Sequence, residues 1–309
     1  MTSAVVCAYS EVGVRCLQAL LDQGVEVMQV LTHEDDRNEN HWFGSVAELA
    51  HQHGLAVATP TDLGDPLWLS SLATPRPDFL FSFYYRYMLP EALLALPLRG
   101  ALNMHGSLLP KYRGRAPVNW AIVHGETETG ATLHYMLAKP DAGAVVGREA
   151  VGIGLNETAG DVSEKVATAA QKLLARVLPA LIAGTALSEP MDLAAGSYFG
   201  RRRPEDGLVD WRWPAARIHN LVRAVAPPFP GAFAFLHGQE LRLLGSHNDL
   251  EDSPQPENAP RLYTEGETLL LDCVDGKRLT LTRAELDGQP LTAANLAGRC
   301  GAPTISVIR

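Results

Sequence analysis

The segment 103–117, which reads NMHGSLLPKYRGRAP, places an asparagine and a histidine two residues apart at the end of an apolar run. In a β-strand, side chains two residues apart project from the same face, so a strand over 100–105 would present Asn103 and His105 together. An asparagine amide can donate a hydrogen bond to an oxyanion that develops during acyl transfer, and a histidine can carry protons near neutral pH. The same pair could also be a turn cap and a structural histidine, and the residue types alone leave both interpretations open.

A carboxylate that could orient His105 occurs in the segment 139–143, which reads KPDAG. Pro140 and Gly143 flank Asp141, which predicts a loop between two strands. Carboxylates commonly hold a catalytic histidine in place through a hydrogen bond. The sequence does not by itself bring Asp141 next to His105, so their pairing is a hypothesis at this stage.

The elements that would position these residues alternate between strands and helices over about the first 180 residues. Short apolar runs predict strands over 4–9, 26–33, 78–84 and 100–105, and 3.6-residue periodicity predicts helices over 12–24, 45–54, 116–125 and 161–184. Such alternation is typical of an α/β domain with a mostly parallel sheet. Ligands of open α/β sheets bind outside the carboxyl ends of the strands, which is where His105 would lie.

A second region follows a polar stretch at 196–211 that carries three consecutive arginines, Arg201–Arg203. After a short helix predicted over 214–226, several brief strand-like runs are separated by turn signals, which predicts a small all-β barrel or sandwich. We therefore expect an α/β catalytic domain over residues 1–200 and a smaller β domain over 201–309.

The composition excludes several classes of protein. With 309 residues and a net charge of −9, the chain is not expected to depend on non-specific binding of nucleic acid or membranes. No basic, apolar leader opens the sequence, and we expect no segment that approaches the roughly 20 residues needed to span a bilayer. The four cysteines form no C-x-x-C pair, which favours reduced cysteines and a cytoplasmic protein.

The long motif NMHGSLLPKYRGRAP, followed by DAG at 141–143, resembles the signature of the folate-dependent formyltransferases. The resemblance extends over most of the chain, from AYSEVG at 8–13 through the C-terminal β region. It implies a Rossmann-like formyltransferase fold followed by an OB-like β-barrel domain. It also implies an N-formyltransferase that uses 10-formyltetrahydrofolate as co-substrate and needs no metal.

The resemblance also implies roles for individual residues of this chain. By position, Asn103 would stabilise the tetrahedral oxyanion, His105 would act as the acid and base, and Asp141 would hold His105 and favour its protonated form. The implied folate site consists of Tyr87, Met88, Leu89, Arg115, Leu137, Ala138, Lys139, Pro140 and Asp141.

The acceptor is expected to be a UDP-linked amino sugar. The segments 81–89, 103–134, 199–207 and 219–233 resemble family members that formylate the 4-amino group of UDP-4-amino-4-deoxy-L-arabinose, a step of lipid A modification and polymyxin resistance. The main alternative is a methionyl-tRNA formyltransferase, which would need a basic insertion where the segment 32–44 is short and acidic. Another nucleotide-linked amino sugar also stays open as acceptor. A non-catalytic folate- or nucleotide-binding module is disfavoured because all three catalytic positions are kept.

Some of the family members that this chain resembles continue into a second activity, an oxidative decarboxylase of UDP-glucuronate. The sequence given ends at Arg309 without such a region. A UDP-glucuronate decarboxylase is therefore a possible missing or separate partner, and the sequence leaves open whether the formyltransferase stands alone.

Three further features have competing interpretations. Arg201–Arg203 could meet a nucleotide diphosphate, although a charge run in a linker is usually solvated. His51 and His53 point to different faces of a helix, which favours a solvated helix end over a metal site. His134 lies in a predicted strand, and the sequence does not decide between a core position and a pocket position.

Overall fold

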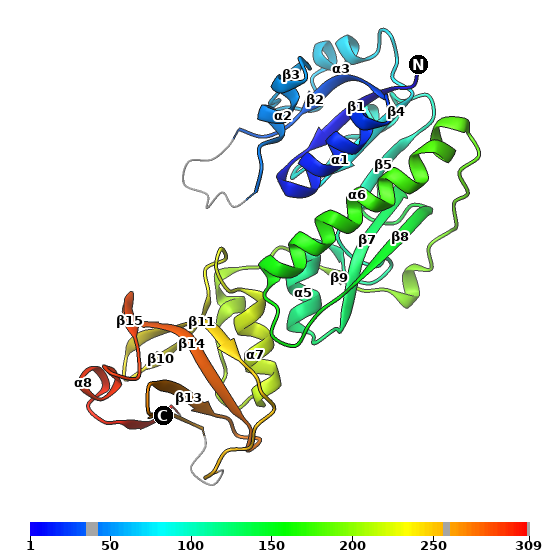
Figure 1. Cartoon of the computed structure of the whole chain (residues 1–309). Coiled ribbons are helices and arrows are strands. Elements are labelled where there is room, and N and C mark those ends of the chain that lie inside the picture. The colour runs from blue at the N-terminus through cyan, green and yellow to red at the C-terminus, as the bar shows by residue number, and fades with distance from the viewer. Residues whose placement is uncertain (35–42, 256–259, 308–309) are drawn as a thin grey trace. The chain divides into compact units, whose positions relative to one another are not determined.

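The computed structural model describes residues 1–34, 43–255 and 260–307, so most of the acidic segment 32–44 lies outside the described residues. The chain divides into two compact units (Figure 1). The first unit consists of Met1–Pro117, Glu128–Gly152 and Ser163–Gly200, and the second consists of Val118–Thr127, Ile153–Val162 and Arg201–Arg309.

The first unit is built on a seven-stranded sheet with the order β3-β2-β1-β4-β5-β7-β8. Its strands are β1 (Ser3–Ala8), β2 (Glu26–Leu31), β3 (Val57–Ala58), β4 (Phe79–Phe83), β5 (Ala101–His105), β7 (Glu128–Tyr135) and β8 (Val145–Gly152). The five strands β1 to β5 are parallel to one another, whereas β7 pairs antiparallel with β5 and with β8. The predicted α/β class with a mostly parallel sheet is confirmed.

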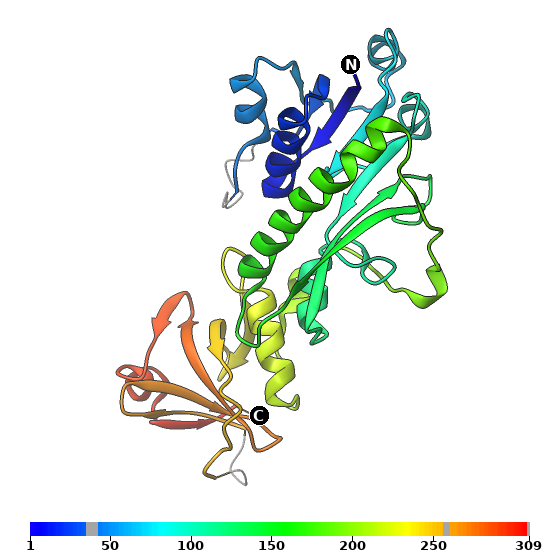
Figure 2. The ribbon, with the colours of Figure 1, turned by 45° about the vertical axis from the view of Figure 1, so that its right-hand side comes forward.

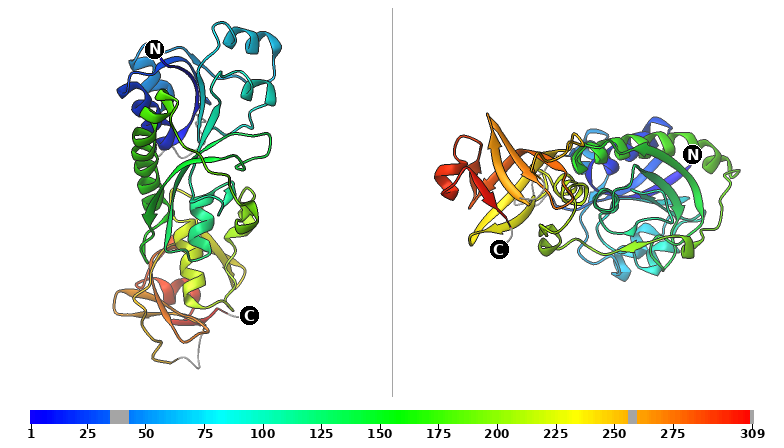
Figure 3. Two further views of the ribbon diagram at one scale, coloured as in Figure 1. Left: turned by 90° about the vertical axis from the view of Figure 1, so that its right-hand side faces the viewer. Right: turned by 90° about the horizontal axis from the view of Figure 1, so that it is seen from below.

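Helices cover both faces of this sheet, as Figure 2 and Figure 3 show. The helices of the first unit include α1 (Ser10–Asp22), α2 (Val46–Gln52), α3 (Pro66–Leu72), α4 (Glu91–Leu94) and α6 (Ala159–Ala183), the last of which begins in the second unit. Side chains from α1, α2 and α6 share one buried cluster with Leu102 and Met104 of β5. Side chains from α3 and α4 share a second cluster with Ala101. Alternate residues of β5 therefore face opposite layers, and Asn103 and His105 lie on the face of Ala101.

Helix α6 corrects one expectation from the sequence. Within the described ranges it is the one helix long and apolar enough to cross a membrane, with a mean hydropathy of 1.4 over its most apolar window. The expectation that no segment approaches this length and apolarity was wrong. The physical reason lies in the core: Ala170, Leu173, Leu174 and Leu178 of this helix are buried against the sheet, and burial on that scale requires apolar side chains.

The second unit carries an antiparallel curled sheet with the order β10-β11-β14-β13-β12-β16, joined by β15 along β14. Its strands are β10 (Ala232–Leu236), β11 (Gln239–His247), β12 (Arg261–Glu265), β13 (Thr268–Asp272), β14 (Arg278–Leu286), β15 (Gln289–Leu291) and β16 (Thr304–Ser306). Helix α7 (Ala215–Ala224) packs its buried face on this sheet, and α8 (Leu296–Cys300) adds Leu296 to the same core. The predicted small β domain is confirmed as a half-barrel. Most of helix α5 (Pro117–Val123) also belongs to this unit.

Candidate active site

The backbone register of β5 places the site. Asn103 and His105 lie at the carboxyl end of this strand on one face, while Met104 is buried in the layer beneath α1 and α6. The antiparallel partner β7 sets Asn103 directly opposite His134 and His105 opposite Thr132. Directly opposite residues of an antiparallel pair bring their side chains within contact distance on one face. Asn103 and His105 therefore share this end of the sheet with a third polar side chain, that of His134.

His105 is held on both ring nitrogens. Its side chain is 7 % exposed, and its Nε2 donates to the backbone carbonyl of Tyr112 over 2.8 Å. Its Nδ1 lies 3.6 Å from Oδ1 of Asp141. Tyr112 adopts a positive φ of 56°, which is uncommon for a residue with a side chain. The structure therefore brings together His105 and Asp141, which lie 36 positions apart in the sequence.

Asp141 is the anionic centre of the site. Its Oδ2 accepts from the backbone N–H of Gly114 over 2.9 Å, and its Oδ1 faces His105 and His134. Burial alone raises the pKa of this carboxyl, but the charge of His105 and the hydrogen bond from the N–H of Gly114 lower it, and the pKa lies well below its usual range. Asp141 is therefore ionised throughout the neutral range. Its backbone has a positive φ of 48°, a conformation that aspartate tolerates better than most residues.

His134 is the site residue that the sequence left undecided. Its Nε2 lies 3.2 Å from Nδ2 of Asn103 and 3.5 Å from Oδ1 of Asp141. The amide Nδ2 of Asn103 also lies 3.5 Å from Oδ1 of Asp141. His134 could have been identified only from the register between β7 and β5. Neither strand specifies that register by its own sequence.

Two glycines allow the chain to pass closely around these side chains. A Cβ on Gly106 would lie 1.7 Å from Oη of Tyr84, and a Cβ on Gly143 would lie 1.9 Å from the backbone carbonyl of Tyr135. Neither position can hold a larger residue without moving its neighbours. The glycines that end β5 and the loop after Asp141 are therefore required by the packing of the site.

The residues expected at the folate site lie in three loops of the first unit. In the loop after β4, Tyr87 and Met88 are largely exposed whereas Leu89 is buried. In the loop 137–141 after β7, Leu137 is likewise exposed, Ala138 and Lys139 are exposed and Pro140 is partly buried. Arg115 is exposed and its guanidinium donates to the carbonyl of Arg86 over 3.3 Å, which ties its loop to the first.

An aromatic cluster beside the first of these loops was not predicted from the sequence. His33, which follows β2, stacks on Tyr85 with the ring centres 4.3 Å apart and meets the edge of Tyr87 at 4.7 Å. The Nε2 of His33 accepts from the backbone N–H of Arg86 over 3.0 Å. Because β2 and β4 flank β1 in the sheet, residues separated by about 50 positions meet at its carboxyl edge.

Other candidate groups lie apart from this chemistry. His51 and His53 are exposed at the end of α2, and no group of three potential metal ligands occurs among the residues that the structure describes. Arg202 stacks over Trp120 at 4.6 Å and donates to the carbonyl of Asp206, while Arg201 and Arg203 are exposed. A role of these arginines in binding a nucleotide diphosphate stays a prediction.

Comparison with known proteins identifies the family of this arrangement. Residues 4–178 match the formyl transferase family, and residues 202–300 match the formyl transferase C-terminal domain. A Helicobacter canadensis N-formyltransferase in complex with folinic acid and dTDP-3-aminofucose has a TM-score of 0.73 at 19 % identity, over 94 % of this chain and 100 % of that one.

Two further solved structures share the fold at similar identity. A 4-N formyltransferase from Francisella tularensis has a TM-score of 0.63 at 19 % identity, over 77 % of this chain and 95 % of that one. HypX from Aquifex aeolicus in complex with tetrahydrofolic acid has a TM-score of 0.64 at 18 % identity, over 96 % of this chain and 47 % of that one. The match to the formyl transferase family covers more than half of the sequence, and the chain belongs to that family.

Proposed function

We propose that this protein transfers the formyl group of 10-formyltetrahydrofolate to the 4-amino group of UDP-4-amino-4-deoxy-L-arabinose, which yields the 4-formamido sugar. The observation that carries the proposal is the convergence of Asn103, His105 and Asp141 at the carboxyl end of β5, within a chain of the formyl transferase family. An amide donor, a proton carrier and a fixed carboxylate are the groups that acyl transfer to an amine requires.

In the proposed reaction the neutral sugar amine attacks the formyl carbon, the bond from that carbon to the folate nitrogen breaks, and the proton lost by the amine goes to the departing nitrogen. Asn103 is proposed to donate an amide N–H to the oxyanion. His105 is proposed to relay the proton through Nδ1, the ring nitrogen on the side of Asp141, because Nε2 is bound to the backbone carbonyl of Tyr112. Asp141 is proposed to orient the ring, because its carboxylate lies 3.6 Å from Nδ1.

The three loops described above fit a pterin ring on chemical grounds. Tyr87, Met88 and Leu137 offer exposed apolar and aromatic surface, which suits the faces of a planar heterocycle. Folinic acid and tetrahydrofolic acid are bound by two proteins of the same fold, which supports a reduced folate as the co-substrate here. When bound, this co-substrate supplies the activated formyl group. We propose Tyr87, Met88, Leu89, Arg115 and Leu137, Ala138, Lys139, Pro140 and Asp141 as the residues around it.

The proposed acceptor is more specific than membership of the formyl transferase family can establish. The Helicobacter enzyme was solved with a dTDP-linked amino sugar and the Francisella enzyme is a 4-N formyltransferase, which supports a nucleotide-linked amino sugar as the acceptor class. The choice of UDP-4-amino-4-deoxy-L-arabinose rests on the likeness of 81–89, 103–134, 199–207 and 219–233 to the formyltransferase domain of ArnA, the polymyxin-resistance enzyme. A role in lipid A modification, a UDP-glucuronate decarboxylase partner and a cytoplasmic location follow from the same likeness and stay predictions.

Methionyl-tRNA formylation is the alternative within the family. The net charge of −9 and the acidic segment 32–44 argue against a grip on a phosphate backbone. The part of that segment between residues 35 and 42 lies outside the described residues, so this argument rests on its composition.

The direct test offers each acceptor separately with 10-formyltetrahydrofolate and follows the release of tetrahydrofolate. We expect turnover with UDP-4-amino-4-deoxy-L-arabinose, slower turnover with a dTDP-linked amino sugar, and none with methionyl initiator tRNA. Turnover with tRNA and none with either sugar nucleotide would overturn the proposal. Turnover with the dTDP-linked sugar alone would keep the reaction and replace the acceptor.

A further inference from the structure

The amide of Asn103 has two chemically opposite ends. To stabilise an oxyanion it must present Nδ2–H to the reacting oxygen, because a flipped amide would present the lone pairs of Oδ1 and repel the developing charge. The two orientations occupy almost the same volume, so packing alone does not choose between them. A hydrogen-bond acceptor beside Nδ2 would make the choice.

His134 provides such an acceptor. Its Nδ1 lies 2.8 Å from the backbone carbonyl of Tyr135, and a carbonyl oxygen can only accept, so the proton of the neutral ring resides on Nδ1. The lone pair of the neutral ring is therefore on Nε2, which lies 3.2 Å from Nδ2 of Asn103. The His134 side chain is 2 % exposed and directly opposite Asn103 in the β5–β7 register, so this contact is fixed by the sheet.

Asp141 assists without replacing His134. Its Oδ1 lies 3.5–3.6 Å from the nearest nitrogens of Asn103, His105 and His134, and its Oδ2 accepts from the N–H of Gly114. The shortest contact of the Asn103 amide in this group is therefore with His134. A flipped amide would set Oδ1 against both the imidazole lone pair and the carboxylate, which is unfavourable on both sides.

The geometry also leaves one amide proton for the reaction. The distances of 3.2, 3.5 and 3.5 Å among Nδ2, Nε2 of His134 and Oδ1 of Asp141 form a nearly equilateral triangle, so the two acceptors subtend about 60° at Nδ2, half of the roughly 120° between the two N–H bonds of a planar amide. A single N–H that points between the two acceptors would serve both of them. The other N–H would then be left for the reaction.

We propose that His134 is a positioning residue for formyl transfer, whose Nε2 lone pair fixes the Asn103 amide so that its second N–H faces the carbonyl oxygen of the formyl group. This inference rests on the proposed function, because it assigns to Asn103 the oxyanion contact of that reaction. His134 acts through Asn103 and does not itself touch the reacting atoms.

The kinetic test compares His134→Leu, which removes the acceptor, with His134→Gln, which keeps a side-chain carbonyl as acceptor. Loss of one oxyanion donor costs about 10²–10³ in kcat elsewhere, so we expect His134→Leu to lower kcat about 10- to 100-fold with both KM values within about twofold of the wild type. We expect His134→Gln to recover at least about tenfold of that loss. Equal effects of the two variants, or a change confined to KM or to thermal stability, would contradict a positioning role.

A spectroscopic measurement keeps the inference testable without turnover. Long-range proton–nitrogen NMR of the ¹⁵N-histidine-labelled wild type should show the proton of the neutral His134 ring on Nδ1. A proton on Nε2 would overturn the inference even if the enzyme is active. If the wild type formylates no nucleotide-linked amino sugar, the proposed function fails instead, and the NMR result still decides the tautomer.

Discussion

Asp141 shows how opposing influences set the charge of the site at the residue scale. Its burial disfavours the anion, while the charge of His105 and one backbone N–H favour it, with the net result that its pKa is held well below the usual range. A folded-state pKa below the unfolded value of about 3.9 means that the carboxylate stabilises the fold above that pH and loses this contribution as the pH falls below it.

The replacement Asp141→Asn tests this linkage, since asparagine tolerates the positive φ of the position. We expect the variant to be destabilised by about 1–3 kcal/mol between roughly pH 5 and 7, because the partners of a buried acceptor are left with a weaker one. The difference in free energy of unfolding between wild type and variant should shrink as the pH falls below about 4. Urea unfolding across this range provides the measurement, and a difference independent of pH would contradict the assignment.

The residue types and their spacing predicted part of this site. The period of two along β5 was sufficient to place Asn103 and His105 on one face. The contact between His105 and Asp141 was expected from the family resemblance alone. Residue spacing could not predict it, because it depends on a chain reversal between two strands. His134 stayed undecided for the same reason, as its environment is created by a register that neither strand specifies alone.

At the scale of elements, the longer strands and helices followed their periodic patterns closely, and the short ones did not. Strand β3 has two residues, too few for any period, and the aromatic contact of His33 depends on the parallel order of β2, β1 and β4. Helix α3 was missed although Asp65 caps it by accepting from the N–H of Leu67. Its seven residues carry too little amphipathic pattern to stand out.

The loop between β7 and β8 offers a prediction at this scale. Gly143→Ala would place a Cβ 1.9 Å from the carbonyl of Tyr135, the same carbonyl that accepts from His134. Because displacement of a site by about 1 Å can cost about 100-fold in rate, we expect kcat/KM to fall about 10- to 100-fold. Gly152→Ala at the end of β8 is the matched control, since no atom lies within 4 Å of its added Cβ. Steady-state kinetics of both variants check this, and equal activity would refute the argument.

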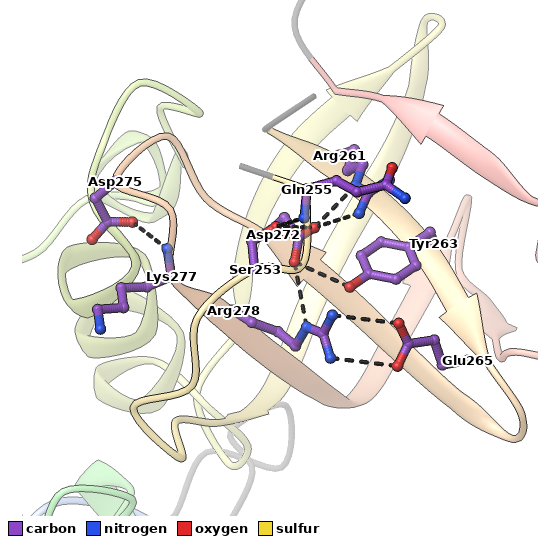
Figure 4. A network of polar contacts seen from close by, with 9 residues as sticks. All are labelled: Ser253, Gln255, Arg261, Tyr263, Glu265, Asp272, Asp275, Lys277 and Arg278. Atoms are coloured by element: carbon purple, nitrogen blue, oxygen red, sulfur yellow. Dashed lines mark hydrogen bonds and ion pairs between the residues drawn. The ribbon is translucent and has the colours of Figure 1, made fainter. Parts of the chain in front are cut away.

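At the scale of the whole molecule, each unit has its own core, and the second contains a buried ionic network (Figure 4). Asp272 is fully buried and accepts from Ser253 at 2.6 Å, from Arg261 at 2.9 Å and from Tyr263 at 3.1 Å, with Arg278 at 3.4 Å. Removal of one partner from such a network leaves uncompensated buried charge.

The matched pair Asp272→Ala and Asp252→Ala tests this network. We expect Asp272→Ala to lower the free energy of unfolding of the second unit by about 3–5 kcal/mol. Asp252 is 79 % exposed and pairs with Lys277, so its loss should cost no more than about 1 kcal/mol. Hydrogen exchange over peptides of 261–286 separates this unit from the first. Similar protection in both variants would show that the network contributes little.

The central claim is that the site at the end of β5 moves a formyl group to a nucleotide-linked amino sugar. The most direct measurement follows an isotopically labelled formyl group from 10-formyltetrahydrofolate into UDP-4-amino-4-deoxy-L-arabinose. Wild type and His105→Ala are compared, after circular dichroism has shown that both proteins are folded alike. The account predicts label on the sugar nitrogen with the wild type and a loss of at least about 100-fold in rate with the variant. Label transfer by the variant at the wild-type rate, or no transfer to any nucleotide-linked amino sugar by the wild type, would contradict it.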